Sequence, residues 1–195
     1  MSDSFRIRRA TYDAAETEGL ADVLIDVVEG GASVGFMLPL PREKALAFWR
    51  SCQASAELRE RTLLVAEDTA TSEIIGTVQV ILAMPDNQPH RGDIAKMQVR
   101  RSARRRGVGA ALMRAAEQAA REAGKFLLVL DTVTGSDAER LYSRLGWVRV
   151  GEIPDYASLP KGGLCGTTVF YRRLDGPTQD GVPRQERDPR ETIAT

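Results

Sequence analysis

Arginines and glycines gather in one short run whose chemistry suits an anion. The run is Arg104-Arg105-Arg106-Gly107-Val108-Gly109-Ala110, and a helical apolar spacing begins at Val108. The start of a helix presents unpaired N–H groups and a partial positive charge. Glycine lets the backbone approach an anion closely, and arginine adds forked donors for phosphate oxygens. The run therefore predicts a pyrophosphate site.

Two common phosphate motifs do not describe this run. A P-loop requires GxxxxGK[ST], which the sequence does not contain. The dinucleotide fingerprint requires a third glycine, and Leu112 stands in its place. The expected anion site therefore belongs to another class of protein.

The elements that would position the run follow from the apolar spacing. Helices are expected over residues 14–28, 42–59, 108–123 and 136–145. Strands are expected over residues 5–9, 63–66, 74–82, 93–99, 126–131, 147–152 and 167–174, while residues 32–38 fit a loop or a short strand. Strands that first form a meander and then alternate with helices predict an α/β fold. Its mixed central sheet would have about seven strands, flanked by about four helices.

The Arg104 run resembles a signature of the GCN5-related N-acetyltransferase (GNAT) family. That signature, Gln/Arg-x-x-Gly-x-Gly/Ala after the fourth strand, is matched by Arg104, Gly107 and Gly109. The segment Ala138-x-x-Leu141-Tyr142-x-x-Leu145-Gly146-Trp147 is similar to the family's next motif, and the order of elements agrees from Phe5 to Leu174. The resemblance implies a GNAT-like (acyl-CoA N-acyltransferase) fold. It also implies an acyltransferase that uses acetyl-CoA as cosubstrate and needs no metal.

Three shorter stretches resemble the tabtoxin-resistance branch of this family, whose chemistry is acetylation of the amine of a β-lactam toxin. They are residues 30–37, 130–132 and 150–156. The resemblance predicts that the acceptor is a primary amine of a small molecule, such as an amino-bearing toxin or antibiotic. Ser33, Phe36, Asp93 and Asp131 would line its pocket. The amine would attack directly in a ternary complex.

The same resemblance gives catalytic roles to three residues. Tyr142 would protonate the departing thiolate, although a tyrosine at such spacing is also a common core residue. Asp131 and Asp93, at the end and the start of neighbouring strands, would remove the proton of the acceptor amine, although either could be only a turn residue. Burial, or a second carboxylate nearby, would raise the pKa of such a base.

The backbone of the fourth strand would hold the coenzyme. Two central parallel strands are expected to splay, leaving N–H and C=O groups of Met97, Gln98 and Val99 free to bind the pantetheine arm. The sequence departs from the family at Gly135, where many members have an asparagine that contacts the coenzyme. Ser136 or Asp137 is the expected substitute.

Other functions fit the sequence less well. Residues 31–35 match the GxSxG elbow of serine hydrolases, but a helix precedes them, and the sole histidine, His90, lies in a polar loop. Lys plus Arg equals Asp plus Glu at 27 each, so the zero formal charge argues against a nucleic-acid binder. Two alternatives stay open: an acetyltransferase for protein N-termini or lysines, and a coenzyme-binding regulatory module without catalysis.

Length and composition set the remaining expectations. The 195 residues suit one domain, placed at 1–174, followed by a polar tail at 175–195 that is rich in proline and charge and is expected to be disordered. Cys52 and Cys165 lie far apart and have one histidine to help them, so neither a disulfide framework nor a metal site is expected. No apolar run is long enough to cross a bilayer, which makes the cytoplasm the default location. The expected partners are the amine acceptor and acetyl-CoA, with no nucleic acid or membrane, and a homodimer stays open.

Overall fold

The structure is a computed structural model that describes residues 4–174, and it has the predicted mixed sheet. The seven strands lie in the order β1-β2-β3-β4-β5-β7-β6, and only the pair β4 and β5 is parallel. Their bounds are β1 Phe5–Arg9, β2 Arg61–Asp68, β3 Ile74–Ile81, β4 Arg91–Val99, β5 Leu127–Val133, β6 Val148–Ser158 and β7 Leu164–Arg173. The first four strands form the meander that the sequence predicts.

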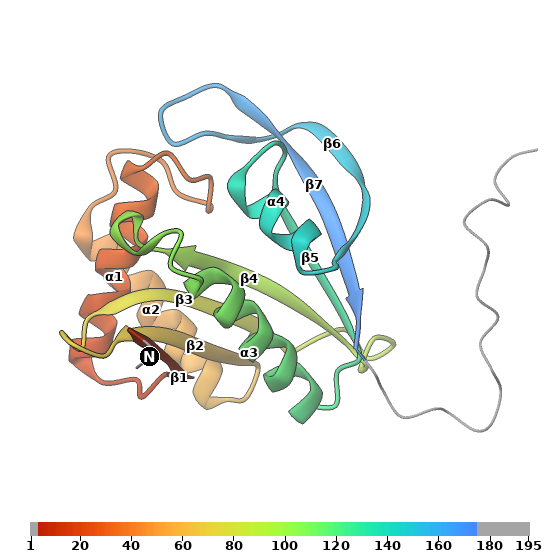
Figure 1. Cartoon of the computed structure of the whole chain (residues 1–195), viewed down its shortest axis with the longest axis horizontal. Helices are drawn as coiled ribbons and strands as arrows, with labels where there is room; N and C mark the ends of the chain where they lie inside the picture. The colour runs from red at the N-terminus through yellow and green to blue at the C-terminus, as the bar shows by residue number, and fades with distance from the viewer. Residues whose placement is uncertain (1–3, 175–195) are drawn as a thin grey trace, which may run out of the picture.

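Four α-helices cover the two faces of the sheet. They are α1 Ala14–Glu29, α2 Arg42–Glu57, α3 Val108–Glu122 and α4 Asp137–Arg144, with a short 3₁₀ turn, η1, at Arg101–Ala103. Figure 1 shows α1 and α2 on one face and α3 and α4 on the other. The fold class is therefore confirmed: a seven-stranded mixed sheet between two pairs of helices.

Each face of the sheet has its own apolar core, because successive side chains of a strand point to opposite faces. The core under α1 and α2 is built around buried residues such as Leu20, Leu24, Trp49, Leu63 and Val65. The core under α3 and α4 includes Leu112, Met113, Leu128, Tyr142 and Phe170. Both cores pack against the sheet, one on each face, and together they hold β4 and β5 in place.

Two segments differ from the sequence expectation. Residues 32–38 form an irregular loop, which resolves the open choice between loop and strand. Strand β6 runs on to Ser158 because the β6–β7 register shifts between Ile153 and Ala157, where Asp155 has a φ of 53°. The predicted tail, 175–195, lies outside the described residues. Within residues 4–174 no helix is long and apolar enough to cross a membrane.

An ionic network fixes the edge strand β1 to β2 and to the start of α1. Glu67, only 5% exposed, accepts hydrogen bonds from Arg6 Nη2 at 2.5 Å and from Arg8 Nε at 2.7 Å. Arg8 Nη1 also reaches Glu16 Oε1 at 2.6 Å. The bond from Arg8, followed by that from Arg6, holds the pKa of Glu67 below its ordinary value. The charged form of Glu67 is thus favoured by folding.

We expect Glu67→Gln to destabilise the fold by about 1–3 kcal/mol at neutral pH, because a buried charge-assisted bond is lost. A carboxylate with a lowered folded pKa stabilises the protein above its unfolded pKa, and this contribution is lost as pH falls through the folded pKa. The difference in the free energy of unfolding between wild type and variant should therefore shrink as the pH falls below about 4.3, the ordinary pKa of Glu. Urea unfolding at several pH values measures it.

The matched control is Glu122→Gln. Glu122 pairs with Arg9 at 2.9 Å, but both side chains are more than half exposed, so its loss should not be measurable. Equal effects of the two substitutions would show that the β1 network does not stabilise the fold.

Candidate active site

The parallel strands β4 and β5 pair over a short stretch and then separate. Their register pairs Arg91 with Leu127, Gly92 with Leu128 and Asp93 with Val129, and it stops there. Figure 1 shows the two strands side by side at one end and diverging toward their C-terminal ends. On the β5 side, the backbone of β4 beyond Asp93 therefore has no strand partner in the described sheet. This is the splay that the sequence resemblance predicts.

Strand β4 bulges within the splay. Thr77 of β3 pairs with Gln98 and Gln79 pairs with Ala95, so two residues of β4, Lys96 and Met97, oppose one residue of β3. Lys96 has a φ of 50°, which non-glycine residues rarely adopt. A bulge re-aims the side chains and backbone groups of its strand. Beyond the bulge, Gln98 and Val99 return to pairing with β3 on their other side.

The start of α3 has the properties of an anion site. Asp13 caps α1 and Ser136 caps α4 with a side chain, whereas α2, after Pro41, and α3, after Gly107, have no side-chain cap. Gly107 has a φ of 84°, and a Cβ placed on it would meet nothing within 4 Å. The first N–H groups of α3 are therefore without a capping side chain, in open space, as a bound phosphate requires.

The three arginines of the run differ in their partners. Arg106 Nη2 lies 2.8 Å from Asp68 Oδ2, and the same nitrogen bonds Ser4. Arg104 and Arg105 are exposed and take part in none of the ion pairs among residues 4–174. They are thus the two arginines of the run that are available for phosphate oxygens, and Arg106 ties the loop to the sheet.

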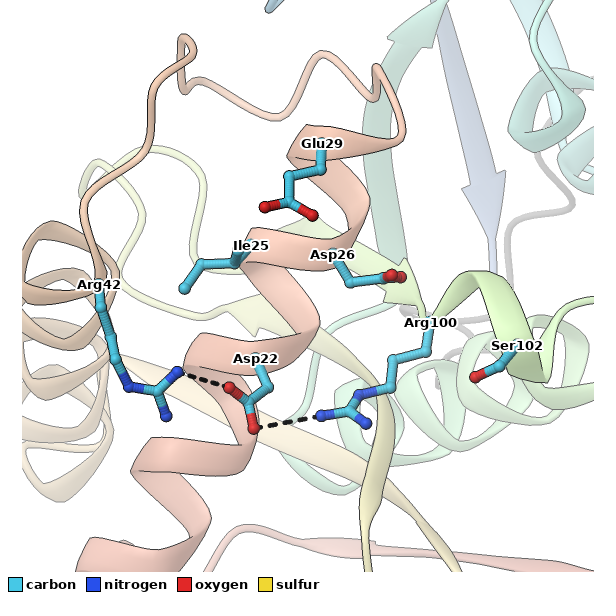
Figure 2. A pocket seen from close by; sticks show the side chains of 7 residues that line it. All are labelled: Asp22, Ile25, Asp26, Glu29, Arg42, Arg100 and Ser102. Atoms are coloured by element: carbon cyan, nitrogen blue, oxygen red, sulfur yellow. Dashed lines mark hydrogen bonds and ion pairs between the residues drawn. The ribbon is translucent and has the colours of Figure 1, made fainter.

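Two hollows lie near this loop. A groove of about 610 Å³ runs past Gly107, Ala111 and Arg114, between α3 and β1. A second hollow of about 300 Å³ lies between α1 and the end of β4, and Figure 2 shows its lining. There Asp22 bonds both Arg42 at 2.6 Å and Arg100 at 3.3 Å, so these three side chains are engaged with one another. None of the predicted site residues lines this second hollow.

The two aspartates meet at the point where the strands separate. Burial raises the pKa of Asp93, Arg91 opposes the rise, and the charge of Asp131 adds to it. The two carboxylates therefore lie near enough for the charge of Asp131 to act on Asp93. Asp131, however, is exposed rather than buried between apolar strands, because the odd positions of β5 face away from the α3 core. Thr167 Oγ1 donates to Asp131 Oδ2 at 2.8 Å.

Tyr142 projects from α4 into the core on the other side of β5. It is 5% exposed, and its ring lies 6.1 Å from the rings of Trp147 and Phe170. Burial, with a smaller contribution from Asp131, raises the pKa of the phenol. The hydroxyl therefore stays protonated at neutral pH. Tyr142 is at once a core residue and a potential proton donor, so the two readings of the sequence are compatible.

The acceptor side of the splay is bounded by the loop between α1 and α2. The Phe36 ring packs edge-on against Phe48 at 5.2 Å. The Ser33 hydroxyl donates to the Ser158 carbonyl at 3.2 Å, so it braces the loop against β6. His90 stacks on Phe126 at 4.9 Å, at the start of β4. Ser33 and His90 thus each have other contacts, and the pair that a serine hydrolase needs is not formed.

The predicted substitutes for the missing asparagine are engaged elsewhere. Ser136 accepts the Glu139 N–H as the cap of α4, and Asp137 pairs with Arg140. Gly135 has a φ of 77° and donates its N–H to Glu139. This turn therefore serves to start α4, which carries Tyr142.

Lys96 was not predicted from the sequence as a site residue, and Gln98 was predicted only for its backbone groups, not for its side chain. Lys96 points from the bulge to the ring of Phe48, with its Nζ 5.7 Å from the ring centroid. Gln98 is 3% exposed, and neither end of its side-chain amide has a hydrogen-bond partner among the described residues. A lone lysine inside the apolar strand 93–99 was the available signal for the first. The second depends on the bulge, which the sequence does not reveal.

Comparison with known proteins defines the class of this domain. Residues 59–149 match the family model described as an acetyltransferase (GNAT) domain. The matched segment runs from the end of α2 to the start of β6, and it contains the splay, the start of α3 and Tyr142.

Solved structures agree over nearly the whole chain. The chain is similar to a GCN5-related N-acetyltransferase from Kribbella flavida, with 23% identity, a TM-score of 0.70, and 89% of this chain and 100% of that one covered. It is also similar to a ribosomal-protein-alanine N-acetyltransferase from Brucella melitensis, with 21% identity, a TM-score of 0.70, and coverage of 87% and 99%. A proposed acetyltransferase from Salmonella typhimurium, solved with its cofactor acetyl-CoA, gives 19% identity, a TM-score of 0.72, and coverage of 92% and 99%.

The chain therefore has the fold of the GNAT acetyltransferases, and its residues 59–149 match the model of that family's domain.

The start of α3 gives a test in which stability and binding move in opposite directions. Ala110 is the third residue of α3. A glutamate at this position can accept hydrogen bonds from the uncapped N–H groups, and the positive end of the helix dipole stabilises its charge. We expect Ala110→Glu to leave stability unchanged or slightly raised, while it abolishes acetyl-CoA binding by occupying and repelling the phosphate position. Calorimetric titration with acetyl-CoA and thermal unfolding measure the two effects.

The control, Ala123→Glu, places the same charge at the exposed C-terminal end of the same helix. It should bind acetyl-CoA as wild type does. Undiminished binding by a folded Ala110→Glu variant would mean that the pyrophosphate lies elsewhere.

Proposed function

We propose that the protein transfers the acetyl group of acetyl-CoA to a primary amine of a small molecule, by direct attack in a ternary complex. The observation that carries the proposal is the splay, which places two carboxylates, a buried phenol and an uncapped helix start around one gap between β4 and β5. Acetyl-CoA supplies the activated thioester. The chain supplies binding groups, a base and an acid.

Several observations support acetyl-CoA as the cosubstrate. Gly107 leaves space at the uncapped start of α3, and Arg104 and Arg105 stand beside it without ion pairs among the described residues. At Gly109 a Cβ would lie 3.1 Å from Leu141 Cδ2, so glycine permits the close approach of α3 to α4. The β4 backbone at Met97, Gln98 and Val99, unpaired toward β5, suits an extended amide chain bound like an added strand.

In the proposed mechanism, a carboxylate removes the proton of the bound ammonium. Asp93 is the proposed base, because burial and the charge of Asp131 raise its pKa against the opposing effect of its ion pair with Arg91. Asp131 attracts the ammonium from the exposed side and adds its charge to the site. Tyr142, protonated at neutral pH, gives its proton to the departing thiolate.

The acceptor side favours a small molecule over a protein chain. The loop between α1 and α2 is joined to the β6–β7 hairpin twice, by the Ser33 hydroxyl to Ser158 O at 3.2 Å and by Leu38 N–H to Pro160 O at 3.2 Å. We expect this joined loop and hairpin to obstruct an extended peptide on the acceptor side of the splay. An amino-bearing toxin or antibiotic, as in the tabtoxin-resistance branch, remains our proposal for the natural acceptor.

The first test is a screen of amines, amino acids, antibiotics and peptides, with release of free coenzyme thiol as the readout. Transfer to small amines, with product mass increased by one acetyl group, is the expected result. Transfer to peptide N-termini or lysines alone would replace the small-molecule proposal. Binding of acetyl-CoA without transfer to any amine would favour a regulatory module.

Tyr142→Phe keeps the ring in its core and removes only the proton that the phenol would donate. General acid catalysis is worth about 10²–10⁴-fold, and because a thiolate leaves easily we expect a loss in kcat near the lower figure. Affinity for acetyl-CoA and the melting temperature should persist. Turnover equal to that of wild type across the pH range would leave Tyr142 with its packing role alone.

The two aspartates can be separated by their pH profiles. With Asp93 as base, kcat/KM falls as pH decreases through its raised pKa, and Asp93→Asn should remove this acid limb and lower the rate by about 10²-fold or more. Asp131→Asn removes a charge that raises the pKa of Asp93, so the acid limb should move to lower pH. The double variant should lose less than the sum of the two single losses, because both residues serve one step.

If the acid limb survives Asp93→Asn and disappears in Asp131→Asn, the roles of the two residues are exchanged. Rates of all three variants close to wild type would remove both from the mechanism.

A further inference from the structure

The acceptor side of the splay carries a lysine that no carboxylate neutralises. Lys96 is half-buried, and among residues 4–174 it takes part in no ion pair. Its surroundings are the face of the Phe48 ring and the open side of Gly35, where a Cβ would lie 3.5 Å from Nζ. The left-handed backbone of the bulge holds the side chain there. Such a position is costly for a cation, since half-buried charges are usually paired.

A second cation stands beside it with neutral partners. Arg61, at the start of β2, donates to Gln79 Oε1 at 2.7 Å, to Ser55 Oγ at 3.0 Å and to Cys52 Sγ at 3.4 Å. None of these groups carries a charge at neutral pH, because burial raises the pKa of the Cys52 thiol. Arg61 makes no ion pair within the described part of the chain. Two cations thus face one region without a counter-charge in contact.

Burial, together with Arg61, lowers the pKa of Lys96, while Cys52 and Asp131 act in the opposite direction. Asp131 is therefore near enough to influence Lys96, yet no ion pair joins the two. Asp131 and Asp93, the latter also paired with Arg91, form the acidic side of the splay, and Lys96 and Arg61 form its basic side. An anion that enters the splay would gain a charge-assisted bond from Lys96 that the protein itself does not provide.

We infer that the acceptor is an amino acid or a close analogue, with its amine held by Asp93 and Asp131 and its carboxylate held by Lys96. This inference rests on the proposed function and narrows its substrate class. Arg61 adds to the positive field around the carboxylate. The rings of Phe36 and Phe48 form an apolar wall next to Lys96, which suits an uncharged part of the acceptor.

A zwitterion fits both sides of this groove better than a simple amine does. A simple amine would leave Lys96 and Arg61 unpaired in the complex, and it would shield them further from water. An amino acid neutralises one side with each of its charges, and its short skeleton fixes the distance between amine and carboxylate. The carboxylate contact also orients the amine toward the splay, where the thioester is expected.

The test compares each common L-amino acid with its own amide, on the full-length protein. The amide lacks the negative charge but keeps the skeleton, and its amine is less basic, so more of it is the reactive free base at neutral pH. A preference for the acid over the amide must therefore come from binding. We expect wild type to prefer at least one acid over its amide in kcat/KM.

Lys96→Met removes the charge and keeps the length of the side chain. We expect KM for the preferred acid to rise roughly ten- to a hundredfold, as for loss of a charged hydrogen bond, with kcat for both acid and amide unchanged. Lys96→Arg should keep part of the preference. The matched control is Lys125→Met. Lys125 lies just before β5 and is half-buried, and burial lowers its pKa too. Its Nζ donates to Pro89 O, away from Lys96.

Calorimetric titration of the same acids and amides into the protein with coenzyme A gives a readout that does not need turnover. Binding of an acid, weakened in Lys96→Met and not in Lys125→Met, supports the inference even if the transfer chemistry of the proposed function fails. Equal use of acids and amides by wild type would overturn it. An equal loss of kcat on acids and amides in Lys96→Met would also overturn it, since Lys96 would then act in the reaction itself. Thermal unfolding of each variant shows that the fold is kept.

Discussion

The separation of β4 from β5 after Asp93 is the constraint on which the rest of the site depends. Backbone N–H and C=O groups that lose a strand partner are costly unless another group satisfies them. The fold accepts this cost at the centre of its sheet, where Gln98 also keeps an amide without a partner among the described residues. Both cores resist closure of the gap, because α3 packs on β2, β3 and β4 while α4 follows β5. The open backbone is therefore a stable feature that a ligand with its own amides can complete.

Three devices at the edges of the splay turn this opening into a site with a direction. The bulge at Lys96 and Met97 re-aims the end of β4, and the left-handed Gly107 then starts α3 without a cap. Phosphates would bind at that end, so the thioester arm would extend back along β4 toward the two aspartates. Tyr142 comes from the opposite face of β5, which separates the proton donor from the base. The acid and the base can thus hold different protonation states at one pH.

Much of this arrangement could be predicted from the sequence because it depends on local patterns. The apolar spacing predicted every helix and strand, although β2 and β6 are longer than expected, and the Arg104 run marked the start of α3. Features that depend on tertiary contacts could not be predicted. Arg106 is paired with Asp68 across the sheet edge, Asp131 faces solvent because of strand parity, and the bulge that exposes Lys96 arises from register. The pattern of strand 93–99 looks the same with or without a bulge.

Unpaired charges at the splay can select a charged ligand even though the whole chain has zero formal charge. Lysine and arginine equal aspartate and glutamate over the chain, and most described charges are engaged with one another at contact, as Asp22 is with Arg42 and Arg100. A charge left without a counter-ion therefore stands out from the rest of the surface. At the splay, Asp93 is paired with Arg91, whereas Asp131 and Lys96 make no ion pair within the described part of the chain. In the proposed complex, the acceptor would be selected by charged side chains, whereas the coenzyme would be held by backbone and helix-start groups that do not depend on the acceptor. The two substrates can accordingly be selected by independent parts of one sheet.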